Sequence, residues 1–467
     1  MKKTAILALL IINLFVLSGC STSWGVKPTT APKTVTLKYW RAWDDTDAFG
    51  DIIKKYNQIH PNIKIEYRKF RYEEYEQQLL EAFAEDRGPD IFSVHNTWVK
   101  KYQTKILPMP DSVSMTYYVE QGTIKKEIVP EKRTEKTLSV KTLQNNFIDQ
   151  VYRDAVINVK DAKTGKNKEW VFGLPLYVDT LAMYYNKDLF NNAGIAEIST
   201  SWNKKFLQDV KKLTKQDSKG QIIQSGVALG GFANIDRATD ILSVLMMQNG
   251  TMMMDGRNVA FNVTPPGEDT KNYNPGLEAL RFYTDFANPS KEVYCWNKNL
   301  NNSLKMFEEN QLAIMFGYSY DLPIIRAEQP KLNFAVTKLP QIENSSVPVN
   351  FANYWLETVA KKTKYSNEAW DFVQFATKAE QAEIYLSKTK KPTALKSLIE
   401  KQSEDPDIGV FAQQLLTAKS WYQGDGAIEA EKIMGEMIDA VVAGLAEPEE
   451  LITIAAKKVS QTVEKNY

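Results

Sequence analysis

The sequence predicts an α/β fold built on a parallel sheet and long enough for two domains or a pair of lobes. Strand and helix patterns alternate from Val35 onward, and 467 residues exceed the usual size of one domain. Residues 35–40 (VTLKYW) alternate like a strand, residues 49–59 place apolar side chains at helical spacing, and residues 63–70 form a second strand pattern. A strand–helix–strand opening of this kind begins a parallel sheet.

The rest of the chain continues this alternation. Helical spacing predicts helices at 72–83, 207–214 with a following turn, 238–250, 277–286, 304–309, 368–376 and 434–445, and Pro448 opens a last one. Further strands are expected at 91–94, 312–319 and 354–360. The continuous apolar run 181–185 predicts a strand buried on both faces, with Asn186 or Asp188 capping the next helix. Residues 161–170 indicate a turn between two short strands, whereas the charged stretch 125–141 is expected to be a surface excursion.

The N-terminus has the pattern of an export signal. Two lysines precede an apolar run at 5–16, which is too short to span a bilayer and fits a secretory signal. The run ends in Leu-Ser-Gly-Cys at 17–20, which resembles the lipobox of bacterial lipoproteins. We therefore expect a signal peptide at 1–20 with lipidation of Cys20, and a flexible tether at 21–34. The mature protein would be exported and anchored to the outer face of the cytoplasmic membrane.

Composition and motifs argue against most kinds of catalysis. The formal charge is +1, so no basic excess points to nucleic acid. With Cys20 lipidated, Cys295 stands alone and no intramolecular disulfide is expected. Only two histidines occur, and there is no Gly-x-Ser-x-Gly, no phosphate loop and no spaced Cys/His set, so neither a metal nor a cofactor is expected. A glycosidase needs only two carboxylates and stays open at this point.

Several segments resemble the extracellular solute-binding proteins of ABC importers, the group that includes the maltose-binding protein. The segments that carry the resemblance are VTLKYW, HPNIKIEY, GPDIFSV, GLPLYVDTLAMYYNKDLFNNAGI, LKMFEENQLAIMFGYS, NYWLETVAKKTKYSNEAWDFVQFAT, KPTALKS and AGLAEPEEL. Each is weak alone, but their order and spacing are specific. The resemblance implies a type II periplasmic-binding-protein-like fold, with two α/β lobes and a ligand cleft between them. Residues 111–170 depart from the family by being more elaborate.

The resemblance also implies how the chain divides between the lobes. We expect an N-terminal lobe of 35–176 plus 345–390 and a C-terminal lobe of 177–344 plus 391–467. The chain would cross the hinge near 176–181, 339–350 and 388–395. Such a protein closes about its hinge, works as a monomer and serves permease subunits in the membrane.

Candidate ligand-binding residues lie where predicted strands end, which is where open α/β sheets bind ligands. A hydroxyl-rich ligand needs aromatic faces for its C–H surfaces and carboxylates or amides for its hydroxyls. The stacking candidates are Trp43, Trp98, Tyr318, Tyr320 and Trp421, the last by its match to a late cleft aromatic of the family. The hydrogen-bonding candidates are Asp44, Asp45, Asn96 and Asp179, and the remaining candidates are Tyr177, Asn234 and Tyr354. Asp44 and Asp45 could instead cap the first helix.

These observations predict a lipid-anchored substrate-binding subunit of an ABC importer that binds a sugar or oligosaccharide. The alternatives are an exported carbohydrate-active enzyme, a receptor for a non-sugar solute, and a receptor that presents its ligand to a sensor.

Overall fold

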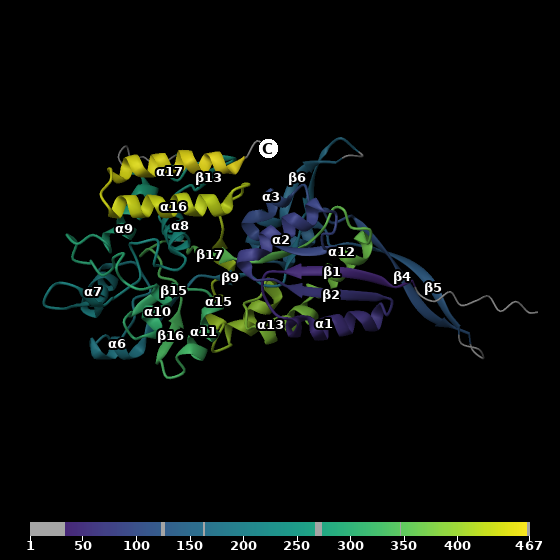
Figure 1. The fold of residues 1–467 in the computed structure, drawn as a ribbon, viewed down its shortest axis with the longest axis horizontal. Coiled ribbons are helices and arrows are strands. Elements are labelled where there is room, and N and C mark those ends of the chain that lie inside the picture. Colours follow the sequence, from purple (N-terminus) through teal and green to yellow (C-terminus); the bar gives the residue numbers. More distant parts are fainter. Residues whose placement is uncertain (1–32, 123–126, 162–163, 267–272, 346, 465–467) are drawn as a thin grey trace, which may run out of the picture.

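The computed structural model describes residues 33–122, 127–161, 164–266, 273–345 and 347–464. The expected signal peptide, most of the tether and Cys20 lie outside these residues. Within them, apolar side chains gather into two separate cores, one drawn mainly from residues 35–178 and the other from the middle and end of the chain. The elements around each core form two lobes, which we call the first and second lobe (Figure 1). The two-lobed α/β fold is confirmed.

The first lobe is built on a five-stranded sheet in the order β2-β1-β3-β18-β8. Its strands are β1 (Val35–Arg41), β2 (Ile63–Lys69), β3 (Ile91–His95), β8 (Leu174–Pro175) and β18 (Trp355–Val359). Strands β1, β2 and β3 run parallel, as the opening pattern predicts, whereas β18 and β8 are antiparallel to their neighbours. The helices of this lobe are α1 (Thr46–Ile59), α2 (Tyr72–Ala84), α3 (Val99–Tyr102), α4 (Val140–Asn146), α5 (Asp149–Ala155), α12 (Ser366–Ala376) and α13 (Ala379–Thr389).

The second lobe has a smaller antiparallel sheet in the order β15-β10-β16. Its strands are β10 (Ala182–Asn186), β15 (Ile314–Gly317) and β16 (Phe334–Thr337). Strand β10 is buried at every position except Tyr185, as its continuous apolar pattern predicts. The Asn186 side chain accepts hydrogen bonds from the N–H groups of Asp188 and Leu189, so it is Asn186 that caps the next helix.

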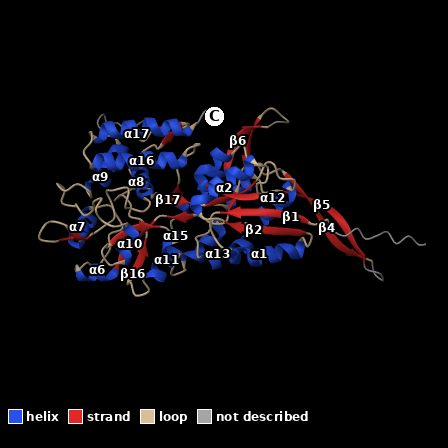
Figure 2. Ribbon diagram, in the orientation of Figure 1, coloured by secondary structure: helices blue, strands red, loops and turns tan. Residues whose placement is uncertain are grey.

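Helices cover the sheet of the second lobe, and the last two lie side by side (Figures 1 and 2). They are α6 (Lys187–Asn192), α7 (Lys204–Leu213), α8 (Ala238–Gln248), α9 (Pro275–Asp285), α10 (Ser303–Glu308), α11 (Asp321–Glu328), α16 (Ala427–Val442) and α17 (Pro448–Val463). Two small hairpins complete the lobe: β11 (Lys215–Gln216) with β12 (Ile222–Gln224), and β13 (Met254–Asp255) with β14 (Asn258–Val259). None of the helices in the described part of the chain has the length and apolar character needed to span a bilayer.

A three-stranded sheet in the order β19-β17-β9 joins the lobes. It consists of β9 (Asp179–Thr180), β17 (Asn350–Asn353) and β19 (Ala418–Lys419). The first two crossings therefore fall close to the expected positions. The third lies later than the expected 388–395, because the side chains of Ala394 and Leu395 are buried in the core of the first lobe. Between them and β19 lie η2 (Lys396–Leu398), α14 (Ile399–Ser403), α15 (Gly409–Ala412) and η3 (Leu415–Thr417).

Two hairpins, with helices α4 and α5 between them, make up the stretch in which the sequence departs from the family. Strands β4 (Ser112–Gln121) and β5 (Glu127–Lys136) form a long antiparallel ribbon that extends away from the first lobe (Figures 1 and 2). The charged stretch is thus a surface excursion, as expected, but residues 127–136 of it form a regular strand that its weak pattern did not indicate. Strands β6 (Val156–Lys160) and β7 (Asn167–Val171) form the second hairpin, which was predicted from its turn.

Candidate functional site

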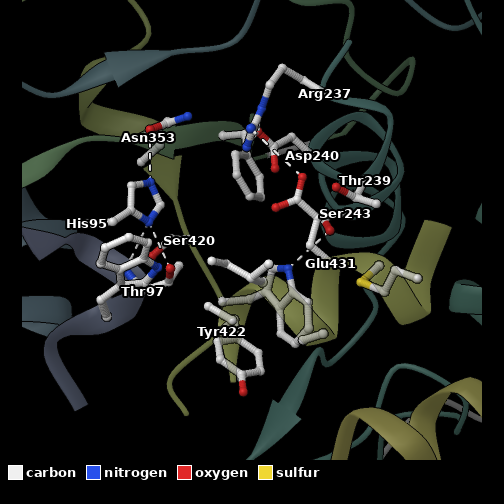
Figure 3. A pocket seen from close by; sticks show the side chains of 18 of the residues that line it. His95, Thr97, Arg237, Thr239, Asp240, Ser243, Asn353, Ser420, Tyr422 and Glu431 are labelled. Atoms are coloured by element: carbon white, nitrogen blue, oxygen red, sulfur yellow. Dashed lines mark hydrogen bonds and ion pairs between the residues drawn. The ribbon is translucent and has the colours of Figure 1, made fainter. Parts of the chain in front are cut away.

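A cavity lies between the two lobes beside the hinge sheet, with about 700 Å³ of empty space when its open mouth is included. The first lobe contributes side chains from the end of β3 and the start of α2, and the second lobe contributes α8 and α16 (Figure 3). The hinge strand β17 and the segment after β19 complete the wall. The lining residues used below are Tyr72, His95, Thr97, Trp98, Arg237, Thr239, Asp240, Ser243, Asn353, Ser420, Trp421 and Glu431.

His95 and Trp98 form the wall from the first lobe, where β3 ends in the short helix η1 (Asn96–Trp98). Nδ1 of His95 accepts from the Thr97 hydroxyl at 2.8 Å, and Nε2 faces Oδ1 of Asn353 in the hinge at 3.0 Å. Burial lowers the pKa of His95 to about 4, so the imidazole is neutral at pH 7. With Nδ1 accepting, the proton lies on Nε2 and is donated to Asn353.

Arg237, Asp240 and Glu431 form the opposite wall (Figure 3). Arg237 precedes α8 in a left-handed conformation with φ 59°, and its Nη2 lies 2.6 Å from Oδ2 of Asp240. The Glu431 carboxylate on α16 lies 3.9 Å from Nη1 of Arg237. Tyr318 donates its hydroxyl to the same Asp240 oxygen at 2.7 Å. The helix start thus presents a fixed ion pair to the cavity.

Trp421 lines the cavity from the segment that follows β19. Its indole Nε1 donates to the Ser243 hydroxyl on α8 at 3.1 Å, which fixes the plane of the ring. Its ring also packs edge-on against Tyr422 at 5.5 Å between centroids. The neighbouring Ser420 donates to Asp154 of the first lobe at 2.9 Å, so this segment is held by both lobes.

The structure brings Trp98 and Trp421 to the cavity, whereas three other predicted aromatics contact its lining residues, or each other, from outside. Trp43 stacks on the cavity-lining Tyr72, with centroids 5.4 Å apart and the planes 16° from parallel. Tyr318 is buried against Asp240, and Tyr320 stacks on Tyr318. Asn96 and Tyr354 lie behind the wall, where both donate to Asp154.

The other predicted site residues do not line this cavity. The Asp44 carboxylate is buried and accepts from Lys391 and Tyr385 at 2.7 Å each, and the Tyr177 ring faces the same ammonium 4.3 Å away. Asp45 precedes α1 without a capping bond and pairs with Lys69 at the surface. Asn234 donates to the carbonyls of Asn297 and Leu300. Ligand contact by these residues stays a prediction.

Asp179 lies in the hinge strand β9 and bonds to the second lobe. Its carboxylate accepts from the N–H and hydroxyl of Ser319, the latter at 2.6 Å, and from the N–H of Thr180. Burial raises the pKa of Asp179 to about 6, although these three donors favour the ionised form. The side chain therefore ties the loop after β15 to the hinge.

Sequence reasoning missed most of the polar side chains that line the cavity, among them the histidine and the three charged residues His95, Arg237, Asp240 and Glu431. A signal existed for two of them, since Arg237 and Asp240 open an otherwise apolar helix, where a charged pair is unusual. Glu431 lies on a long C-terminal helix with charges on several faces, and its placement depends on how that helix packs. The described residues hold no group of three or more metal-ligating side chains.

Comparison with known proteins matches residues 42–383 to the model of a family described as bacterial extracellular solute-binding protein. The galactooligosaccharide-binding protein of Bacillus subtilis is 20% identical over 87% of this chain and 83% of its own length. The maltodextrin-binding protein MdxE of the same organism is 25% identical over 52% of this chain and 55% of its own. Among solved structures, the cyclic α-maltosyl-1,6-maltose binding protein of Arthrobacter globiformis superposes with a TM-score of 0.66 at 18% identity, covering 92% of this chain and 99% of that one.

Proposed function

Because the chain belongs to the bacterial extracellular solute-binding protein family, we propose that it binds a sugar or oligosaccharide between its lobes for an ABC importer. The observation that carries the proposal is the cavity beside the hinge, walled by both lobes and bearing Trp98 and Trp421. Relatives named for galactooligosaccharides and maltodextrins support it. We further propose anchoring through Cys20 and delivery of the ligand to permease subunits.

The chemistry of the cavity suits a hydroxyl-rich ligand. The two indoles offer flat apolar faces to the C–H surfaces of a sugar ring, and their orientation is fixed by packing and by the bond from Trp421 to Ser243. Around them stand the hydroxyls of Thr97, Thr239 and Ser243, which can exchange hydrogen bonds with sugar hydroxyls, and the carboxylate of Glu431, which can accept them. A few directional polar groups on an apolar wall are typical of small-molecule sites.

Binding by hinge closure follows from where these groups lie. Trp98 belongs to the first lobe and Glu431 to the second, so a ligand that contacts both is held best when the lobes are together. Three two- to four-residue strands connect the lobes, and short connections of this kind can absorb the rotation. We place the lobes at 35–176 plus 345–390 and 177–344 plus 391–467, as the sequence suggests, except that the first-lobe core also takes in Ala394, Leu395, Leu398, Ala412, Leu415 and Ala418.

Calorimetric titration with a panel of neutral mono- and oligosaccharides tests the proposal. We expect Trp421→Ala to weaken binding of the best ligand by more than about 1 kcal/mol, because an aromatic anchor is lost. Trp170→Ala is the matched control, since Trp170 lies in the β6–β7 hairpin and does not line the cavity. Uniform failure of the sugars alongside tight binding of amino acids or polyamines would contradict the proposal.

The same ligands separate a binding protein from a carbohydrate-active enzyme. We expect oligosaccharides to be recovered at full length after prolonged incubation with the protein. Time-dependent chain shortening, measured by chromatography, would instead assign a catalytic role to the carboxylates of the cavity.

A further inference from the structure

The charged groups that line the cavity are unequal in number. Arg237 is the one cationic lining residue among the described residues, and it faces two carboxylates, Asp240 and Glu431. His95 adds no positive charge at pH 7, because burial lowers its pKa to about 4. The cavity therefore carries a net negative charge.

The single cation is already paired. Arg237 donates from Nε to Oδ2 of Asp240 at 2.8 Å, and Nη2 lies 2.6 Å from the same oxygen. Nη1 makes no hydrogen bond to Asp240 and lies 3.9 Å from the Glu431 carboxylate, so an anionic ligand group that approached the guanidinium there would lie beside both carboxylates. Displacing Asp240 to free the other two nitrogens is strongly unfavourable, since removing one partner of a buried pair leaves the other charge uncompensated. A second cation, Lys101, lies behind Trp98 and pairs with Glu76.

Glu431 is the carboxylate that can accept further hydrogen bonds from a ligand. Its side chain is 46% exposed at the mouth of the cavity, and its ion pair with Arg237 is a long one. Burial and the nearby Asp240 raise its pKa, whereas Arg237 and the Thr239 hydroxyl favour its ionised form. The groups that face it are thus Arg237, Thr239 and Asp240 from α8 and its start, with Tyr72 from α2 across the mouth. A carboxylate in this position accepts hydrogen bonds and attracts cations.

From this arrangement we propose that the cavity selects saccharides by charge, admitting neutral and amino-bearing sugars and rejecting those that carry a carboxylate. This inference rests on the proposed function. A uronate placed within about 4–5 Å of Glu431 or Asp240 would meet two like charges, and the nearby cation Arg237 already neutralises only one of them. Allowing for solvent screening at the mouth, such repulsion weakens binding by roughly ten-fold or more.

The test is calorimetry on the full-length protein at pH 7 and low salt with matched probes. The probes are glucose, galactose and mannose with their 2-amino and 6-carboxylate forms, each as monomer and as 1,4-linked trimer. We expect the carboxylate form of the best neutral probe to bind at least about ten-fold more weakly than the neutral form. This gap in affinity should narrow in high salt. The amino form should bind as well as the neutral one or better.

A pair of variants on α16 assigns the effect to its source. Glu431→Gln should narrow the gap between neutral and carboxylate probes several-fold, because it removes one negative charge from the wall. Glu436→Gln is the control, since Glu436 lies on the same helix, pairs with Lys432 and does not line the cavity. It should leave the gap unchanged.

Each remaining outcome has a definite meaning. Equal or tighter binding of a carboxylate probe overturns the charge selection while leaving saccharide binding intact. A gap that survives Glu431→Gln unchanged at low salt also overturns it. If no probe of any charge binds, both this inference and the proposed function fail.

Discussion

Asp44 shows how a residue predicted to contact the ligand can instead use its side chain for contacts within the fold. Asp44 follows the first strand beside Trp43, yet its carboxylate is buried between Lys391, Tyr385 and Arg41. Burial opposes its ionisation, but the two cations outweigh that effect and hold the pKa of Asp44 below its usual range. Its backbone is also left-handed, with φ 67°. Asp44 thus fixes the turn that presents Trp43 to a residue that lines the cavity.

We expect Asp44→Asn to lower the free energy of unfolding by about 3–5 kcal/mol at pH 7, because it leaves buried cations without their partner. Asp45→Asn should change it by less than about 1 kcal/mol, since the pair with Lys69 is exposed to solvent. Urea unfolding followed by circular dichroism measures both. Because the folded-state pKa of Asp44 is lowered, its contribution to stability is present above the unfolded pKa and is lost as pH falls. The stabilities of the wild-type protein and Asp44→Asn should therefore converge in acid. Equal losses for the two variants would contradict this role.

Asp179 has the opposite pH dependence. Its folded-state pKa is raised to about 6 from an ordinary value of 3.8, so the folded protein binds a proton more readily than the unfolded chain. Its contribution to stability is therefore fully present below pH 3.8 and declines as pH rises through 6. Relative to Asp179→Asn, which cannot titrate, the wild-type protein should lose about 2 kcal/mol between pH 4 and pH 7. Parallel stability curves for the two proteins over this range would exclude the raised pKa.

The same residues show where sequence reasoning about the site succeeds and fails. Trp98 could be identified because its polar neighbours in HNTW are untypical of a core, and Trp421 through its match to a late cleft aromatic of the family. Asp44 could not be separated from a ligand contact, because its partners Lys391 and Tyr385 lie more than 340 positions away in the chain. Glu431 was missed for a related reason: its role comes from the packing of α16 against α8, which no local pattern records.

Among the strands, those with a buried face could be predicted from the sequence and the exposed β5 could not. Strands β1, β3 and β10 were predictable because one or both faces are buried and their apolar patterns show it. Strand β5 was missed because most of its side chains are polar or charged and exposed, so no alternation in hydropathy marks it. Its regularity comes from pairing with β4 over ten residue pairs, a long-range property that depends on its partner.

Helix α16 packs in the second lobe and also carries Glu431, so a change in its packing can move the cavity wall. The ring of Phe232 lies directly against Gly435, where an added Cβ would overlap the ring atoms. We expect Gly435→Ala to destabilise the protein by about 1–3 kcal/mol and to weaken saccharide binding, because α16 must shift and it carries Glu431.

Gly50→Ala is the control for this prediction. Gly50 also lies within a helix, α1, but no atom stands within 4 Å of a Cβ added there, so alanine should stabilise by about 0.5–1 kcal/mol. Thermal unfolding and calorimetry of both variants measure the two effects. Unchanged affinity in Gly435→Ala would show that α16 adjusts without moving the cavity wall.

At the scale of the whole molecule, two cores are joined by only three short strands among the residues described, so each lobe can keep its structure while the angle between lobes changes. The loop bearing Ser319 is bonded to the hinge strand through Asp179, and His95 reaches the hinge through Asn353. Side chains at and near the cavity are thus bonded directly to the strands about which the lobes would turn. A ligand can favour the closed arrangement only by its better contacts there, and Trp98 and Glu431 supply these from opposite lobes.

We therefore expect a saturating neutral saccharide to reduce the radius of gyration measured by small-angle X-ray scattering. Trp421→Ala should need more ligand to reach the same compact state, since the closed form loses an aromatic contact while the hinge is untouched. Asp179→Asn should behave differently: the hinge bond to Ser319 is weakened, so the radius without ligand should change while the fully closed radius does not. A radius that stays constant at saturating ligand, with binding confirmed by calorimetry in the same sample, would rule out closure as the means of binding.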